Sequence, residues 1–135
     1  MTAKEYLSQA RRLDERINSK IQQVDSLNAL ATKCTSTLTD MPKNPGDSTS
    51  RMEDVIVKII ALEEEINQDI DRLVDLKAEM MRAIEAVADP DEQLVLQYRY
   101  LDNCNWEEIG TRLGVSSRTV HRVHGSALQN FIVPA

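Results

Sequence analysis

The chain has few of the residues that build a compact core. Of its 135 residues only 4% are aromatic, four are glycine and two are cysteine, whereas 28% are charged and the net charge is −6. Aromatic side chains supply much of the buried area in ordinary domains. With so few of them, we expect long solvated helices and an all-α fold.

The sequence lacks the residue patterns that are typical of metal sites, phosphate-binding loops and catalytic nucleophiles. Cys34 and Cys104 match no metal-ligand spacing, and His121 and His124, although three residues apart, have no carboxylate or thiol at a spacing that would complete a metal site. No glycine-rich phosphate loop and no nucleophile beside a base is visible. We therefore expect no metal, no cofactor and no enzymatic activity.

The sequence also lacks a membrane signature. It has no signal-like segment at its start and no apolar run long enough to cross a bilayer. We expect a cytoplasmic protein with no membrane partner. In a reducing compartment both cysteines would be free thiols.

Two long stretches have the apolar spacing of packed helices. Over residues 4–38 apolar positions alternate in steps of mostly three and four: Tyr6, Ala10, Leu13, Ile17, Val24, Leu27, Ala31, Cys34 and Leu38. Lys20 interrupts this seam, and we expect Ile21 beside it to cover much of the gap. An isolated polar residue in such a seam can set the register of two helices.

The second stretch, 51–88, has the stronger seam. It repeats every seventh residue, with isoleucines between: Met52, Ile59, Ile66, Leu73, Met80 and Val87, then Ile56, Ile70 and Ile84. Residues 39–50 contain two prolines, a glycine and several short polar residues, which predicts a loop. Residues 1–89 are thus predicted to form a long antiparallel helical hairpin.

The second helix has more apolar surface than one partner covers. Outside the main stripe it carries Val55, Val57, Ile60, Leu62, Val74, Leu76 and Met81. An apolar helix surface of this extent is normally buried against another protein surface. We expect a second copy of the chain, which gives a homodimer; the alternative is a monomer whose hairpin folds onto its own carboxy-terminal module.

Residues 90–135 are predicted to form a three-helix module. Asp89 and Pro90 suit the cap and first position of a helix. Its inward residues would be Leu94, Val95, Tyr98 and Leu101. A turn over 102–105 then leads to the second helix of the module.

The last two helices are predicted from their caps. Asn105 caps the first, whose inner face has Ile109 and Leu113; Gly110 admits a neighbouring helix and Gly114 ends the helix in the left-handed conformation. We expect the Val115 side chain to fill the space at the turn between the two helices. Ser116 then caps the second helix, whose buried stripe is Val120, Val123, Ala127 and Leu128.

This arrangement is typical of a DNA-binding helix-turn-helix. It places Ser117, Arg118, His121 and Arg122 on the outer face of the second helix, where arginine can read guanine and serine or histidine can contact bases or phosphates. Arg112 and Thr119 are candidate phosphate contacts. We expect His124 at the buried boundary and Trp106 as a core anchor.

Residues 94–131 carry a resemblance to a known family. The segments Tyr98-Arg-Tyr-Leu, Trp106-Glu-Glu-Ile, Leu113-Gly-Val-Ser and Thr119-Val-His-Arg-Val-His-Gly-Ser-Ala-Leu resemble region four of the sigma-seventy factors. More narrowly, they are similar to phage-encoded regulators of Gram-positive bacteria, including late-gene activators. The resemblance implies binding to promoter DNA and contact with RNA polymerase. It departs in one respect, because no lysine or arginine follows Arg122.

The predicted module carries little positive charge. From Pro90 onward four arginines face five acidic residues. Because duplex affinity depends on neutralising phosphates, one copy should bind weakly, and dimerisation would compensate. Two alternatives stay open: a DNA-packaging subunit similar to the phage small terminases, which commonly place the DNA module first, and a protein-only adaptor that binds RNA polymerase.

Overall fold

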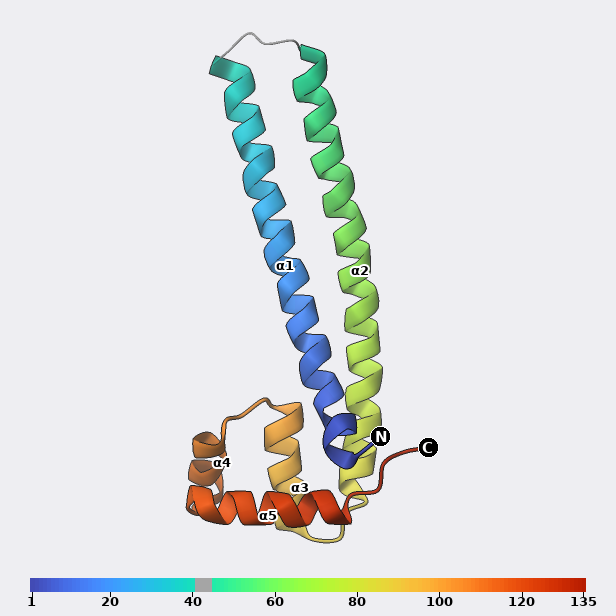
Figure 1. Cartoon of the computed structure of the whole chain (residues 1–135), viewed down its shortest axis with the longest axis vertical. Coiled ribbons are helices and arrows are strands. Elements are labelled where there is room, and N and C mark those ends of the chain that lie inside the picture. Colours follow the sequence, from blue (N-terminus) through green and yellow to red (C-terminus); the bar gives the residue numbers. More distant parts are fainter. Residues whose placement is uncertain (41–44) are drawn as a thin grey trace. The chain divides into compact units, whose positions relative to one another are not determined.

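The computed structural model describes the backbone of residues 1–40 and 45–135, and the side chains of 1–33 and 50–135. Every regular element in these ranges is helical, which confirms the all-α prediction (Figure 1). The elements are α1 (Ala3–Asp40), α2 (Pro45–Glu85), α3 (Pro90–Leu96), the π-helical turn η1 (Gln97–Leu101), α4 (Trp106–Leu113) and α5 (Ser117–Asn130). None of the described helices is both long enough and apolar enough to span a bilayer.

The first two helices have bounds that differ from those predicted. α1 reaches Asp40 and α2 begins at Pro45, so part of the predicted loop 39–50 is helical. Proline is favoured at the first position of a helix, because its fixed φ suits the helix and its missing N–H is not needed there. α2 ends at Glu85, three residues before the predicted end. The part of the predicted loop at 41–44 lies outside the described residues.

The chain forms two compact units. The terminal unit consists of Met1–Asp14 and Arg72–Ala135, and the central unit of Glu15–Asp71. This division differs from the predicted boundary between residues 89 and 90. The reason is a shared core, since Leu7 of α1 and Ile84 of α2 are buried in the same cluster as Phe131.

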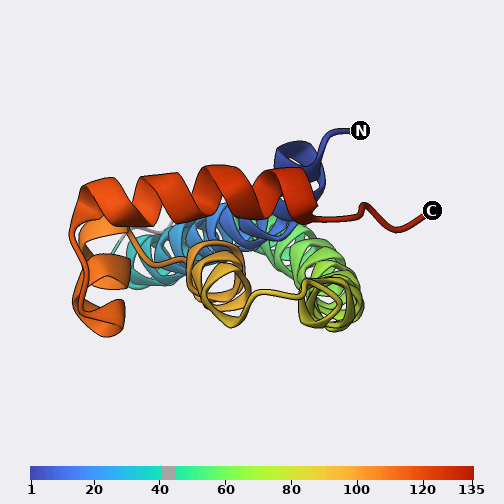
Figure 2. The same ribbon diagram turned by 90° about the horizontal axis from the view of Figure 1, so that it is seen from below.

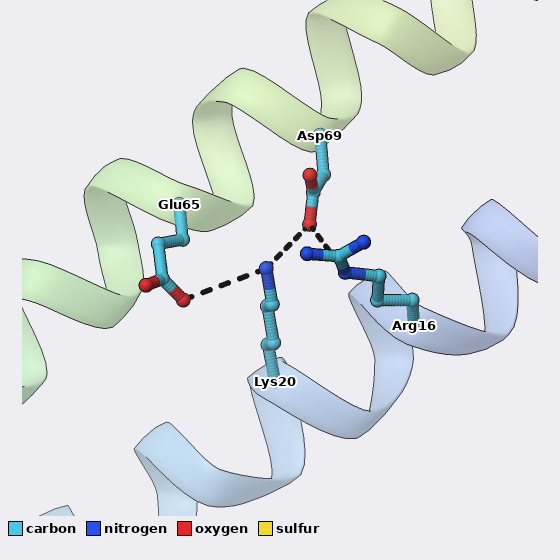
Figure 3. A network of polar contacts seen from close by, with 4 residues as sticks. All are labelled: Arg16, Lys20, Glu65 and Asp69. Carbon is cyan, nitrogen blue, oxygen red and sulfur yellow. Dashed lines mark hydrogen bonds and ion pairs between the residues drawn. The ribbon is translucent and has the colours of Figure 1, made fainter.

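A polar network joins the two helices of the central unit (Figure 3). The Lys20 ammonium of α1 lies between two carboxylates of α2, 2.7 Å from Asp69 Oδ2 and 3.5 Å from Glu65 Oε2. Arg16 Nε lies 3.6 Å from the same Asp69 oxygen. The side chains of Lys20 and Asp69 are only 13% and 4% exposed, so this pair occupies the contact between the helices.

The network corrects two details of the predicted seams. Ile21 is 42% exposed and does not cover the position of Lys20, which itself lies in the seam. On α2, Ile56 and Ile70 are also exposed, whereas Asp69 is buried. Because Asp69 turns inward to meet Lys20, its neighbour Ile70 lies about 100° further round the helix, outside the contact.

The terminal unit has a core built from both ends of the chain. Its buried residues come from α1, α2, α3, η1 and α5 and from their flanks: Tyr6, Leu7, Ala10, Met80, Ile84, Val87, Leu96, Tyr100, Leu101, Ala127 and Phe131. The rings of Tyr6 and Phe131 stack with centroids 5.9 Å apart. Figure 2 shows the last turn of α5 close to the start of α1. Leu76 and Met81 pack against this core, whereas Val74 is exposed.

A second cluster lies inside the last three helices. It contains Val95, Cys104, Ile109 and Val120, with Trp106 packed against it. Burial raises the pKa of the Cys104 thiol, which is free. The side chain of Cys34 lies outside the described residues.

The turn η1 changes which residues of the first module helix face inward. The Asp102 amide donates to the Gln97 carbonyl at 3.0 Å, a bond across five residues instead of four. The extra residue in that turn shifts the following side chains around the helix axis. As a result Tyr100 is buried, whereas Tyr98, predicted to point inward, is half-buried. In α3, before this turn, Leu96 is buried and Leu94, also predicted to point inward, is half-buried.

Candidate nucleic-acid interface

Local capping positions the two helices that carry the candidate site. Asn105 Oδ1 accepts from the Glu108 amide at 2.8 Å, and α4 ends at Gly114, whose φ of 70° is left-handed. Ser116 Oγ accepts from the Thr119 amide at 3.3 Å. Each cap satisfies an N–H that the helix itself leaves unpaired. These three predicted ends are confirmed.

The turn between α4 and α5 and the start of α5 both pack closely on Gly110. A Cβ added at Gly110 would lie 2.9 Å from the Val115 carbonyl oxygen, so the absence of a side chain admits the turn itself. The Val115 amide donates to the Gly110 carbonyl at 3.0 Å. The Val115 side chain is 40% exposed and does not fill the space at the turn. The backbone of Val115 occupies that space instead.

The predicted base-reading residues share an exposed face of α5. Ser117, Arg118, His121 and Arg122 are all exposed, in the first two turns of the helix. The opposite side is buried through Val120, His124 and Ala127. The two arginine side chains therefore project from the outer side of α5.

The two predicted phosphate contacts have structural roles. Arg112 lies 5.1 Å from the centre of the Tyr98 ring and 3.9 Å from Asp102 Oδ2. It is nevertheless half-exposed. Thr119 is half-buried, and its hydroxyl lies 3.1 Å from Ser116 Oγ within the helix cap. Of this pair, Arg112 keeps more accessible surface for a ligand.

Trp106 joins the start of α4 to the outer face of α5. Its ring centre lies 4.4 Å from that of His121 and 4.7 Å from that of His124. The Arg99 guanidinium lies 4.3 Å from the Trp106 ring centre, within the range of a cation–π contact. Trp106 is half-buried against the second core, as its predicted role of core anchor requires.

Sequence reasoning did not single out Arg99 as part of this site. Its side chain also donates to the Cys104 carbonyl at 3.2 Å. The π turn η1 determines where Arg99 points, and regular helical spacing gives no sign of such a turn.

His124 is buried, as predicted, and is held by a hydrogen bond. Its Nε2 lies 2.7 Å from the Tyr100 hydroxyl. Burial, with smaller contributions from the nearby Arg99, Lys4 and His121, lowers the pKa of His124 to about 4. The imidazole is therefore neutral at pH 7 and anchors α5 to η1 as a polar core group.

Glu92 fixes α5 from the other side. The carboxylate is 5% exposed and accepts from the Ser126 hydroxyl at 2.7 Å and from the Asn130 amide group at 3.1 Å. Glu92 lies in the first turn of α3, where its negative charge also interacts favourably with the helix dipole. The hydrogen bonds show that it also holds the carboxy-terminal half of α5 in place.

Comparison with protein families decides where the chain belongs. Residues 32–131 match the family described as "Protein of unknown function (DUF1492)", which is well over half of the chain. The chain is a member of the DUF1492 family. The DUF1492 match includes all of α2 to α5 and leaves out most of α1. Neither the curated proteins nor the solved structures gave a match.

Proposed function

We propose that the chain is a sequence-specific DNA-binding regulator of transcription in which α4 and α5 form a helix-turn-helix. One observation carries the proposal. The row Ser117, Arg118, His121 and Arg122 is exposed on the first two turns of α5, while the opposite side of that helix is fixed in a core. A recognition helix presents base-contacting residues from its first turns in this way.

The chemistry of the row suits base edges in the major groove. Arg118 and Arg122 are four residues apart, so they lie one above the other on α5. Each guanidinium can donate two hydrogen bonds to the acceptors of a guanine. His121 and Ser117 lie beside them as further donors or acceptors.

The resemblance of residues 94–131 to sigma-seventy region four supports the same function. It favours a regulator of the phage or prophage type, acting on promoter DNA and contacting RNA polymerase. The lengths and caps of α4 and α5 agree with such a module.

We further propose that the central unit forms a homodimer as a helical hairpin. Ile56, Ile60 and Ile70 lie along one stripe of α2, and all three are more than 40% exposed. A stripe of this kind is typical of a helix with an uncovered partner face. Two modules carried by one dimer would raise the effective concentration at a double site and compensate for weak single contacts.

Sedimentation of two variants would test the dimer. Ile60→Glu places a charge in the stripe and should convert a micromolar dimer to monomer. Gln68→Glu makes the same charge change at another exposed position of α2 and should leave the dimer intact. A monomeric wild-type protein at this concentration would rule the dimer out.

DNA binding itself is tested by removing the two arginines. The sequence bound by the intact protein would first be selected from random duplexes at a stated salt concentration. The double variant R118A/R122A should then lose the preference for that sequence, about 10²-fold or more, because each bidentate contact contributes roughly 1–3 kcal/mol. The charge-matched control R51A/K58A removes two cations of the central unit and should keep the preference. Full selectivity of R118A/R122A would exclude α5 as the reading helix.

One observation favours a different function. The terminal unit holds ten lysine and arginine residues against eleven acidic ones, so it attracts DNA only weakly as a whole. A protein-only adaptor that binds RNA polymerase would suit this balance. Capture of purified polymerase by an intact protein that binds no duplex at low salt would establish the adaptor instead. A ring of many copies by native mass measurement would favour the packaging subunit.

A further inference from the structure

The start of α1 belongs to the same compact unit as the proposed recognition helix. Tyr6, Leu7 and Ala10 are buried in one cluster with Ala127 and Phe131, at the end of α5 and just after it. These contacts hold the start of α1 near the end of α5. Cations at the start of α1 are thereby brought into the unit that is proposed to read DNA.

One stripe of α1 borders the module. Leu7 is fully buried, and Asp14 Oδ2 accepts from Asn103 Nδ2 at 3.2 Å, so positions 7 and 14 face the module. Lys4 and Arg11 lie on this stripe, each three residues before one of those positions. Both side chains are exposed. Arg12, next in sequence, is about 100° further round the helix and away from this border.

Two pKa shifts agree with this position of Lys4 and Arg11. Burial lowers the pKa of Arg99, and the nearby Arg11 guanidinium lowers it further. Lys4 likewise lowers the pKa of the buried His124. Lys4 and Arg11 therefore lie within electrostatic range of two residues that pack on Trp106.

A line of cationic and polar groups thus leads from α5 to α1. It runs from His121 through Trp106 and Arg99 to Arg11. A cation at the edge of a duplex-binding site can neutralise a backbone phosphate. The module from Pro90 onward has a charge of −1, which leaves it short of phosphate contacts.

We propose that Lys4 and Arg11 are phosphate-contacting residues of the DNA interface, which extends from α5 along the first three turns of α1. This inference rests on the proposed function and adds a second element to it. Phosphate contacts fix a protein on the duplex without reading sequence. Lys4 and Arg11 contribute affinity for the duplex, whereas Arg118 and Arg122 contribute sequence specificity.

The salt dependence of binding tests the proposal in the intact protein. The probe is a fluorescein-labelled 30-base-pair duplex of random sequence, followed by anisotropy between 50 and 200 mM KCl. Each phosphate contact contributes about 0.9 to the slope of log affinity against log salt. The slope should therefore fall by about one for R11Q and by about two for K4Q/R11Q.

Matched variants separate position from charge. R12Q removes the same charge one residue along and should leave the slope at the wild-type value. R11K, which keeps the charge, should keep the slope as well. All these side chains are exposed, so circular dichroism and thermal unfolding should coincide with the wild type. A slope unchanged by K4Q/R11Q, or lowered equally by R12Q, would overturn the proposal.

The outcomes also separate this inference from the proposed function. If the wild-type protein binds no duplex at 50 mM salt, both fail together. If R118A/R122A loses sequence preference while K4Q/R11Q keeps the wild-type slope, only the role of α1 fails. Under the proposal, K4Q/R11Q weakens selected and random duplexes by the same factor, so the preference between them is unchanged.

Discussion

At the residue scale, His124 makes stability depend on pH. Its pKa of about 4 in the folded chain lies below the ordinary value of 6.5. Between these values the unfolded state binds more protons, so stability is complete above pH 6.5 and is lost as pH falls toward 4. The expected loss is on the order of 3 kcal/mol, at 1.36 kcal/mol per pKa unit.

Urea unfolding at pH 7.0, 5.5 and 4.5 would measure this loss. His124→Gln should be less stable than wild type at pH 7, but the difference between the two should shrink toward pH 4.5. His121→Gln replaces an exposed histidine and should follow the wild-type profile. A constant difference between His124→Gln and wild type across this range would contradict the prediction.

Glu92 gives a second residue-scale prediction. Glu92→Leu removes the acceptor of Ser126 and Asn130 and should lower the free energy of unfolding by roughly 1–3 kcal/mol, because hydrogen bonds to a charged carboxylate are lost. Thermal unfolding followed by circular dichroism would show it. Asp91→Leu, next in sequence but exposed, should cost distinctly less. Equal losses would mean that the hydrogen bonds of Glu92 do not stabilise the fold.

Residues whose roles are local were predicted best. Asn105, Ser116 and Gly114 act on helix ends a few positions away, so their neighbours in sequence are also their partners. The role of Gly110 depends on a carbonyl brought back by the turn, and that of Arg99 on a π turn. Neither follows from spacing along a regular helix.

At the scale of elements, the Lys20–Asp69 pair aligns α1 with α2 in the central unit. Asp69→Leu alone should lower the free energy of unfolding by ~3 kcal/mol, because it takes a carboxylate partner from a mostly buried ammonium. The double variant Lys20→Leu/Asp69→Leu should recover most of that loss. Urea denaturation of both variants tests this. A double variant no more stable than the single one would show that the pair contributes net stability.

The same pair shows what helical patterns leave open. The interruption of the first seam by Lys20 was visible in the sequence. Its partner was not, because Asp69 lies 49 residues away and resembles any exposed acid in a charged helix. For this reason the predicted apolar seam of α2 placed Ile56 and Ile70 at the contact with α1, where the structure has Asp69.

At the scale of the whole molecule, the last three helices depend on residues outside them. A fragment of residues 90–135 would expose Leu96, Tyr100 and Phe131, which pack on Tyr6, Leu7 and Ile84 in the full chain. We expect it to be largely unfolded at 25 °C, with weak helical circular dichroism. Joining α1 and α2 to the fragment restores its core. A cooperative transition of the isolated fragment at the melting temperature of the full chain would contradict this dependence.

The sequence was sufficient for the order of the helices but not for the division into units. Apolar periodicity and caps are properties of each segment, so α1 to α5 were all expected near their observed positions. The shared core joins residues more than 90 positions apart, such as Tyr6 and Phe131. A single sequence carries no signal that pairs them.

The stacking of Tyr6 on Phe131 has a consequence for synthesis on the ribosome. The opening turns of α1 emerge long before the residues they pack on, so the nascent chain cannot complete the terminal unit until Phe131 has left the exit tunnel. Products of early termination would carry the long helices without a complete terminal unit. Only chains translated through Phe131 can bury Tyr6 and Leu7 in the complete core of the terminal unit.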